Sequence, residues 1–94
     1  MREYEVTFIV HPDLDETAFN ELVNRVSSWI TEDGGEVTKI DLWGKRRMAY
    51  PIRKVNDGQY VHMQTKMNTK FGVTLERNLR FSEPVLRFLI IAKE

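Results

Sequence analysis

The chain contains no cysteine, which excludes a disulfide framework, a thiolate metal site and a cysteine nucleophile. No apolar run approaches the ~20 residues of a membrane-spanning helix. The only two histidines, His11 and His62, lie on different predicted elements, and neither has a third ligand nearby in sequence. We therefore predict no metal site and no cofactor. Glycine-rich phosphate loops and serine elbows are also missing, so the sequence contains few candidate catalytic residues.

What is present is an ordinary globular composition, with 41% hydrophobic and 30% charged residues in a chain of 94 residues. This length predicts one small domain spanning residues 1–94. The N-terminal residues enter an alternating pattern directly and do not resemble a secretory leader. We therefore expect a cytoplasmic protein.

Charge is distributed unevenly along the chain, although the net charge is zero. Residues 1–42 hold ten acidic and three basic residues, a balance of −7, whereas residues 43–94 hold eleven basic and four acidic residues, a balance of +7. Such asymmetry between halves is a recognised indication of a nucleic-acid-binding surface. Charges scattered over solvated faces would be the simpler alternative.

The first half of the chain predicts a strand, a helix and a second strand. Residues 2–10 alternate between apolar and polar positions, as in a half-buried strand. Asp15 is a suitable helix N-cap, and Gly34-Gly35 ends the apolar helical periodicity that follows it. Residues 36–54 form the second strand, with a bulge after Val37. Because this strand contains a proline, we place it at a sheet edge.

The second half predicts the same order of strand, helix and strand. The Asn56-Asp57-Gly58 segment predicts a tight hairpin turn, and residues 59–67 form the returning strand. Asn68 is expected to cap a second helix, which Ser82-Glu83-Pro84 ends, and residues 85–92 form the last strand.

The predicted order β-α-β-β-α-β is typical of an α+β, ferredoxin-like fold. Right-handed crossovers place the first and third strands at the centre of a four-stranded antiparallel sheet, with both helices on one face. The other face is left for solvent or a partner. The predicted core contains Val6, Phe8, Leu22, Val26, Ile30, Leu75, Leu79 and Phe88.

Residues 43–54 carry the most informative chemistry. Five bases occur within these twelve residues, together with two aromatic side chains: Lys45, Arg46, Arg47, Arg53, Lys54, Trp43 and Tyr50. Basic side chains neutralise phosphates, and aromatic rings stack on unpaired bases or sugars. Charges that guard an edge strand against aggregation would explain one or two of these bases, but not three in succession. We therefore hypothesise an RNA-binding surface, which Arg80 and Arg87 could extend.

Three motifs point to a known family. They are the opening Arg2-x-Tyr4-Glu5-x-x-x-Ile9, the turn His11-Pro12-Asp13-Leu14, and the run Trp-Gly-Lys-Arg-Arg-Met-Ala-Tyr-Pro-Ile over residues 43–52. In these motifs the chain resembles the bacterial ribosomal protein S6 family, and the resemblance extends from Met1 to about Lys93.

The resemblance implies a non-catalytic structural constituent of the small ribosomal subunit, located in the cytoplasm and bound to the ribosome. It implies binding to the central domain, or platform, of small-subunit ribosomal RNA, with ribosomal protein S18 as a heterodimer partner. Carried over by position, the residues facing RNA or the partner are Arg2, Lys45, Arg46, Arg47, Tyr50 and Arg53. A negative residue, Glu3, occupies a position where a base would have favoured RNA binding.

We expect the partner to dock on the edge strand around residues 40–53, beside Trp43 and Tyr50, because an edge strand offers unpaired backbone groups. The open face of the sheet is the alternative. Two other functions remain open: a single-stranded RNA reader that uses the open face, or a small-molecule regulatory module. The RNA reader is disfavoured because Tyr60 is the only aromatic residue on that face of the third strand, and Glu3 and Glu5 would repel phosphate.

Overall fold

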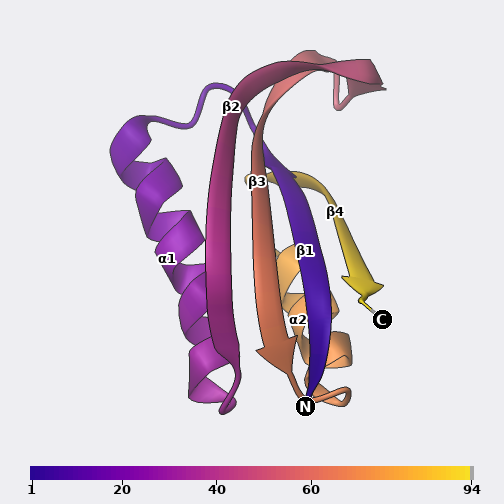
Figure 1. The fold of residues 1–94 in the computed structure, drawn as a ribbon. Helices are drawn as coiled ribbons and strands as arrows, with labels where there is room; N and C mark the ends of the chain where they lie inside the picture. Colours follow the sequence, from indigo (N-terminus) through magenta and orange to yellow (C-terminus); the bar gives the residue numbers. More distant parts are fainter. Residues whose placement is uncertain (94) are drawn as a thin grey trace.

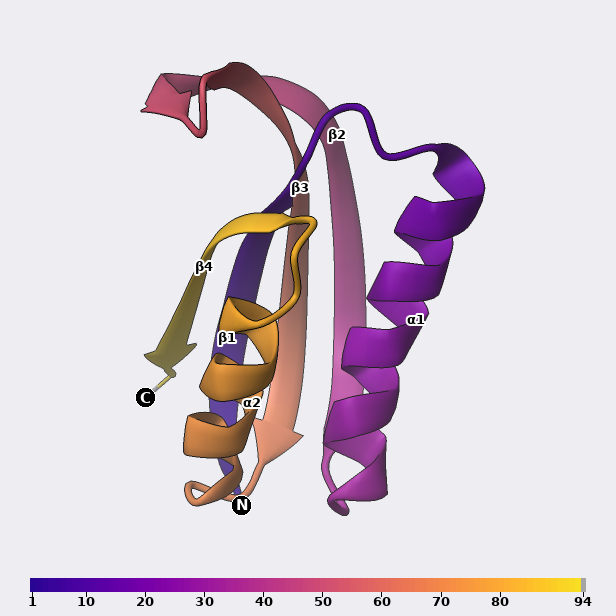
Figure 2. The same cartoon turned by 180° about the vertical axis from the view of Figure 1, so that it is seen from behind.

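The computed structural model describes residues 1–93 and contains two layers. A four-stranded sheet lies on one side, and two helices pack against one of its faces (Figures 1 and 2). The elements are β1 (Arg2–Val10), α1 (Glu16–Glu32), β2 (Glu36–Ile52), β3 (Val55–Met67), α2 (Phe71–Arg80) and β4 (Val85–Ala92). The strand order is β2-β3-β1-β4, and all neighbouring strands are antiparallel. The predicted ferredoxin-like order, with the first and third strands at the centre, is confirmed.

The core lies between the helices and the two central strands. Alternate residues of β1 and β3 point toward the helices and are buried, as the alternation predicted. The core residues of these strands are Tyr4, Val6, Phe8, Val10, Val61, Met63, Thr65 and Met67. No helix within the described residues is long and apolar enough to cross a membrane.

Helix α1 begins and ends as predicted. The Asp15 carboxylate accepts a hydrogen bond from the backbone N–H of Ala18 at 2.8 Å, which caps the first turn. Beyond the predicted core positions, Phe19 and Val23 are also buried. Gly35 packs so closely that a Cβ there would lie 2.8 Å from the backbone oxygen of Lys66. The chain therefore leaves α1 for β2 through a position that has no room for a side chain.

The β2–β3 hairpin turn is not where the sequence placed it. The prediction of a turn at Asn56-Asp57-Gly58 is wrong, because these residues belong to β3, and Asp57 and Gly58 pair with Arg47 and Arg46 of β2. The chain turns at Arg53 and Lys54, which have φ angles of 51° and 65°, between the paired residues Ile52 and Val55. The hairpin therefore continues past the last β1–β3 pair, Val10 with Gln59, and its tip projects beyond the sheet (Figure 1).

The packing of Gly58 explains why the Asp57-Gly58 pair does not mark the hairpin turn. A Cβ at this position would lie 2.2 Å from Cγ2 of Ile9, so the glycine makes room for a side chain of β1. Its role is close packing within a strand, not a left-handed turn conformation.

Two smaller predictions in the second half are also corrected. Asn68 does not cap α2: the N-cap is Lys70, and the Asn68 side chain accepts a hydrogen bond from the Lys70 backbone N–H at 3.4 Å. Phe88 is half-buried where burial was predicted. It lies on β4, an edge strand, and the nearby helix α2 has only ten residues. The helical layer therefore covers this edge of the sheet only partly.

Candidate functional site

The end of the β2–β3 hairpin carries five of the predicted basic residues on one exposed segment, which we call the basic arm (residues 45–54). Lys45, Arg46 and Arg47 lie on β2, and Arg53 and Lys54 form the turn; all five are exposed. The paired strands of the arm extend beyond the last β1–β3 pair (Figure 1). The structure therefore brings together five of the predicted binding residues.

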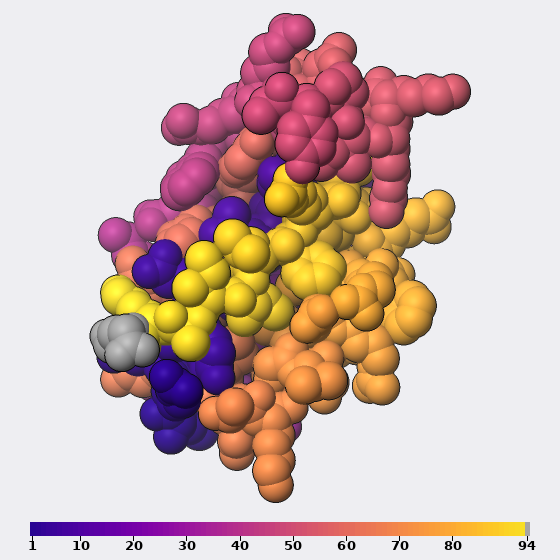
Figure 3. Space-filling view, turned by 90° about the vertical axis from the view of Figure 1, so that its right-hand side faces the viewer, coloured from indigo at the N-terminus to yellow at the C-terminus, as the bar shows by residue number. Residues whose placement is uncertain are grey.

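Two arginine contacts attach the arm to the β4 region. The Arg53 guanidinium donates a hydrogen bond from Nη1 to the backbone oxygen of Glu83 at 2.8 Å. The Arg87 guanidinium donates to the hydroxyl of Tyr50 and lies 5.7 Å from the centre of its ring. Figure 3 shows the tip of the arm lying against β4. Arg87 thus joins the arm, as the sequence suggested it could.

The remaining two predicted basic residues, Arg2 and Arg80, lie elsewhere. Arg2 is at the opposite end of β1, where it pairs with Met67 at the far end of β3. Arg80 lies on α2 and forms an ion pair with Glu76 at 2.6 Å. Neither residue is brought to the basic arm.

Trp43 lies at a β-bulge on the open face of the sheet. The register between β2 and β3 shifts between Leu42 and Gly44, and Gly44 adopts a φ of 79°. A Cβ on Gly44 would meet nothing within 4 Å, so the glycine serves the backbone conformation and not a close approach. The bulge re-aims the Trp43 side chain.

The Trp43 ring forms a stack that the sequence did not predict. Its ring centre lies 6.1 Å from that of Tyr60 and 5.7 Å from that of His62, with nearly parallel planes. The Arg46 guanidinium lies 5.6 Å from the Trp43 ring centre. Sequence reasoning treated Tyr60 as isolated, because only the bulge brings Trp43 beside it. The available signal was Gly44, the glycine that directly follows Trp43 within the predicted strand.

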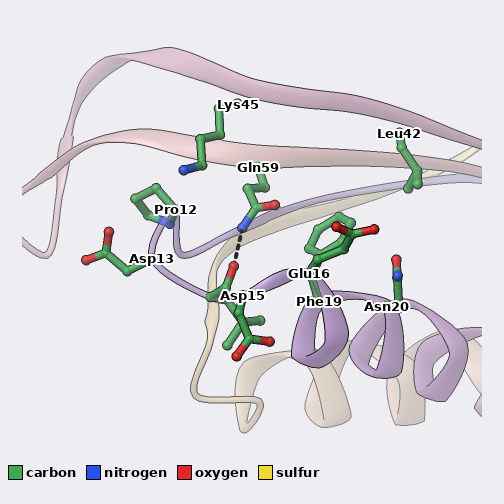
Figure 4. Close-up of a pocket in the computed structure, with 10 residues that line it drawn as sticks. Pro12, Asp13, Asp15, Glu16, Phe19, Asn20, Leu42, Lys45 and Gln59 are labelled. Carbon is green, nitrogen blue, oxygen red and sulfur yellow. Dashed lines mark hydrogen bonds between the residues drawn. The ribbon is translucent and has the colours of Figure 1, made fainter.

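A hollow lies between the arm and the start of α1 (Figure 4). Its volume is about 650 Å³, and two of its polar side chains, Gln59 and Asp15, form hydrogen bonds within the fold. Gln59 donates to the backbone oxygens of His11 and Leu14 at 3.1 and 3.2 Å, and Asp15 caps α1. No group of three metal-ligating side chains occurs within residues 1–93.

Comparison with known proteins supplies the family. The model of the family described as ribosomal protein S6 matches residues 3–92. The small ribosomal subunit protein bS6 of Carboxydothermus hydrogenoformans is 44% identical over 94 residues, covering 100% of this chain and 98% of its own. The bS6 protein of Clostridium acetobutylicum is 45% identical over 94 residues, covering 100% and 99%.

A solved structure has the same fold. The crystal structure of 30S ribosomal protein S6 from Thermotoga maritima superposes with a TM-score of 0.93 at 30% sequence identity. The match covers 98% of this chain and 87% of the other. Sequence and structure therefore give the same assignment.

Proposed function

The chain belongs to the ribosomal protein S6 family, a family of structural, non-enzymatic proteins of the small ribosomal subunit, and we propose that it binds ribosomal RNA through the basic arm. The RNA is the central domain, or platform, of the small-subunit RNA, and the protein partner is ribosomal protein S18. The assembly takes place in the cytoplasm. The observation that carries the proposal is the exposed arm with its five bases.

The geometry of the arm supports phosphate binding. Five bases on the arm and Arg87 beside it give up to six cations within one region. The aromatic rings of Trp43 and Tyr50 hold Arg46 and Arg87 in place, so less side-chain freedom is lost on binding. Each neutralised phosphate releases counterions, which makes the affinity dependent on salt.

The charge balance explains the need for a partner. The net charge of this chain is zero, and its N-terminal half is acidic. Alone, such a surface is expected to bind RNA with a dissociation constant of roughly 10⁻⁴–10⁻⁶ M, which is typical of non-specific contacts. A second protein that adds contacts and fixes the register would raise the affinity.

A test compares two triple variants of matched charge. In the first, Lys45, Arg46 and Arg47 are replaced by Ala; in the second, Arg25, Lys70 and Arg77 on the helical layer and its connecting loop are replaced by Ala. Binding to a central-domain RNA fragment with S18 present is measured over a range of salt concentrations. The arm variant should flatten the slope of log affinity against log salt by up to about three units, and the control should change it much less. Equal slopes for the two variants would refute RNA binding by the arm.

A further inference from the structure

The basic arm lies against one end of the sheet, where three register partners form a row across three strands (Figure 3). Ile9 of β1 pairs with Tyr60 of β3 and with Arg87 of β4. Directly opposite residues share one face of a sheet, so these side chains lie together on the face away from the helices. A hollow of about 120 Å³ lies between this row and the arm, and the arm residues that line it are Met48, Ala49, Tyr50 and Ile52.

Met48 shows that the arm packs against the rest of the protein. It is the only buried residue among residues 45–54, with 6% of its surface exposed. Within the described chain, residues 1–93, the core between the helices and the sheet does not include Met48. Its burial therefore comes from the packing of the arm beside the row, and burial of this apolar side chain favours one position of the arm.

Two arginines attach the arm at two further points. The Arg87 guanidinium donates a hydrogen bond to the Tyr50 hydroxyl and lies 5.7 Å from the centre of the Tyr50 ring; we call this contact the clasp. The Arg53 guanidinium donates to the backbone oxygen of Glu83 at 2.8 Å, just before β4. A two-stranded hairpin has little stability of its own in water, so a segment that extends past the sheet depends on such contacts for a fixed direction.

A fixed direction of the arm favours binding, because ordering a flexible segment costs free energy. A mobile arm loses its freedom when RNA binds, whereas an attached arm has already lost it in the free protein. Lys45, Arg46 and Arg47 precede Tyr50 along the same strand and are exposed. The position of the clasp therefore sets the position of these three bases.

We propose that Tyr50 and Arg87 are positioning residues for RNA binding: the clasp holds the arm against β4, and Lys45, Arg46 and Arg47 contact the phosphates. The proposal rests on the proposed function, in which the arm binds ribosomal RNA. It gives Tyr50 and Arg87 a role within the protein, whereas the sequence pointed to a surface that faces RNA or a partner.

The first experiment compares two variants that each remove one positive charge, Arg87→Gln and Arg47→Gln. Affinity for the central-domain RNA fragment, with S18 present, is measured over a range of salt concentrations. Both variants should bind RNA more weakly, Arg87→Gln by roughly two- to tenfold. Arg47→Gln should flatten the slope of log affinity against log salt by about one unit, because one phosphate contact is lost, whereas Arg87→Gln should change it by less than about half a unit.

The second experiment removes the acceptor of the clasp without changing any charge. Tyr50→Phe should weaken RNA binding by roughly two- to tenfold, because one hydrogen bond is lost. Tyr60→Phe removes the same oxygen from a tyrosine outside the clasp, and this matched control should bind as the unmodified chain does. The double variant Tyr50→Phe/Arg87→Gln should bind no more weakly than Arg87→Gln alone, because both changes break one contact.

Amide hydrogen exchange of the free chain tests the clasp without RNA. Tyr50→Phe should speed the exchange of backbone amides in residues 45–54 by roughly two- to tenfold and leave those of β1 unchanged, because only the arm is released. Tyr60→Phe should leave both sets of amides unchanged.

Failure of this inference is distinguishable from failure of the proposed function. If the arm amides of Tyr50→Phe exchange as slowly as those of the unmodified chain, the clasp does not hold the arm and the proposal is wrong. If Arg87→Gln flattens the salt slope by a full unit, or if the two single losses add in the double variant, Tyr50 and Arg87 contact RNA themselves; the proposal is then wrong while RNA binding by the arm stands. If replacing Lys45, Arg46 and Arg47 together leaves RNA binding unchanged, the proposed function fails and this inference fails with it.

Discussion

An added methyl group at Gly35 should be costly, because rigid backbone surrounds the position. A Cβ at Gly35 would lie 2.8 Å from the Lys66 oxygen, 2.9 Å from the Ile30 oxygen and 2.9 Å from Ile30 Cγ2. Two of these three atoms belong to backbone, in β3 and in α1, so relief requires the helix end and the sheet to move apart. Overpacking of this kind costs about 1–3 kcal/mol. The reduced freedom of the unfolded chain returns about 0.4–1 kcal/mol.

Gly35→Ala should therefore lower the free energy of unfolding by about 1–2 kcal/mol, after both effects are combined. Gly72→Ala is the matched comparison, because Gly72 lies in α2 and a Cβ there meets nothing within 4 Å. This second variant should raise the free energy by about 0.5–1 kcal/mol, the usual preference for Ala over Gly in a helix.

Urea denaturation followed by tryptophan fluorescence would measure both variants. With a slope of roughly 1–3 kcal/mol/M, the midpoint for Gly35→Ala should fall by about 1 M, and that for Gly72→Ala should rise by a few tenths. The reasoning is refuted if Gly35→Ala is as stable as the unmodified chain, or if the two variants shift in the same direction.

Two further predictions concern side chains. Phe88→Ala should cost less than the ~3–5 kcal/mol of a buried phenylalanine, whereas Leu79→Ala, at a fully buried position, should cost about 2–5 kcal/mol. Denaturant unfolding would compare them, and a larger loss at Phe88 would mean that β4 is covered more completely than its exposure indicates. Trp43→Ala should weaken association with the proposed partner S18 more than it lowers the free energy of unfolding, because the ring is 44% exposed and contributes little to the core, and exposed aromatic rings are frequent anchors of protein interfaces. Calorimetric titration of the folded variant with S18 decides this, and an unchanged affinity would count against any docking beside Trp43.

The fold was predictable because the apolar–polar alternation of the strands and the helical periodicity of the helices in the sequence match the observed elements along most of the chain. The inward positions of β1 and β3 follow from a period of two, and burial confirms them. The hairpin turn was not predictable in this way, since Gly58 is required by Ile9 across the sheet, a contact that local sequence does not reveal. Tertiary packing overrode the turn signal.

The candidate site was predictable in composition but not in arrangement. The bases of the arm follow from a single run of sequence, and the structure keeps them together. Arg80 was included on charge alone, and it belongs to α2, in the helical layer. The stack of Trp43 on Tyr60 and His62 depends on a bulge, and a shift of one residue changes which side chains meet.

The turn at Arg53 and Lys54 imposes a compromise on the molecule. Both residues hold left-handed φ angles that favour glycine or asparagine, at a cost of about 1–2 kcal/mol each. An Asn-Gly turn would relax this strain, but it would also remove two cations from the point of the arm that projects beyond the sheet. At this hairpin, relaxed φ angles and two positive charges in the turn exclude each other. The chain keeps the two charges and accepts the strained φ angles.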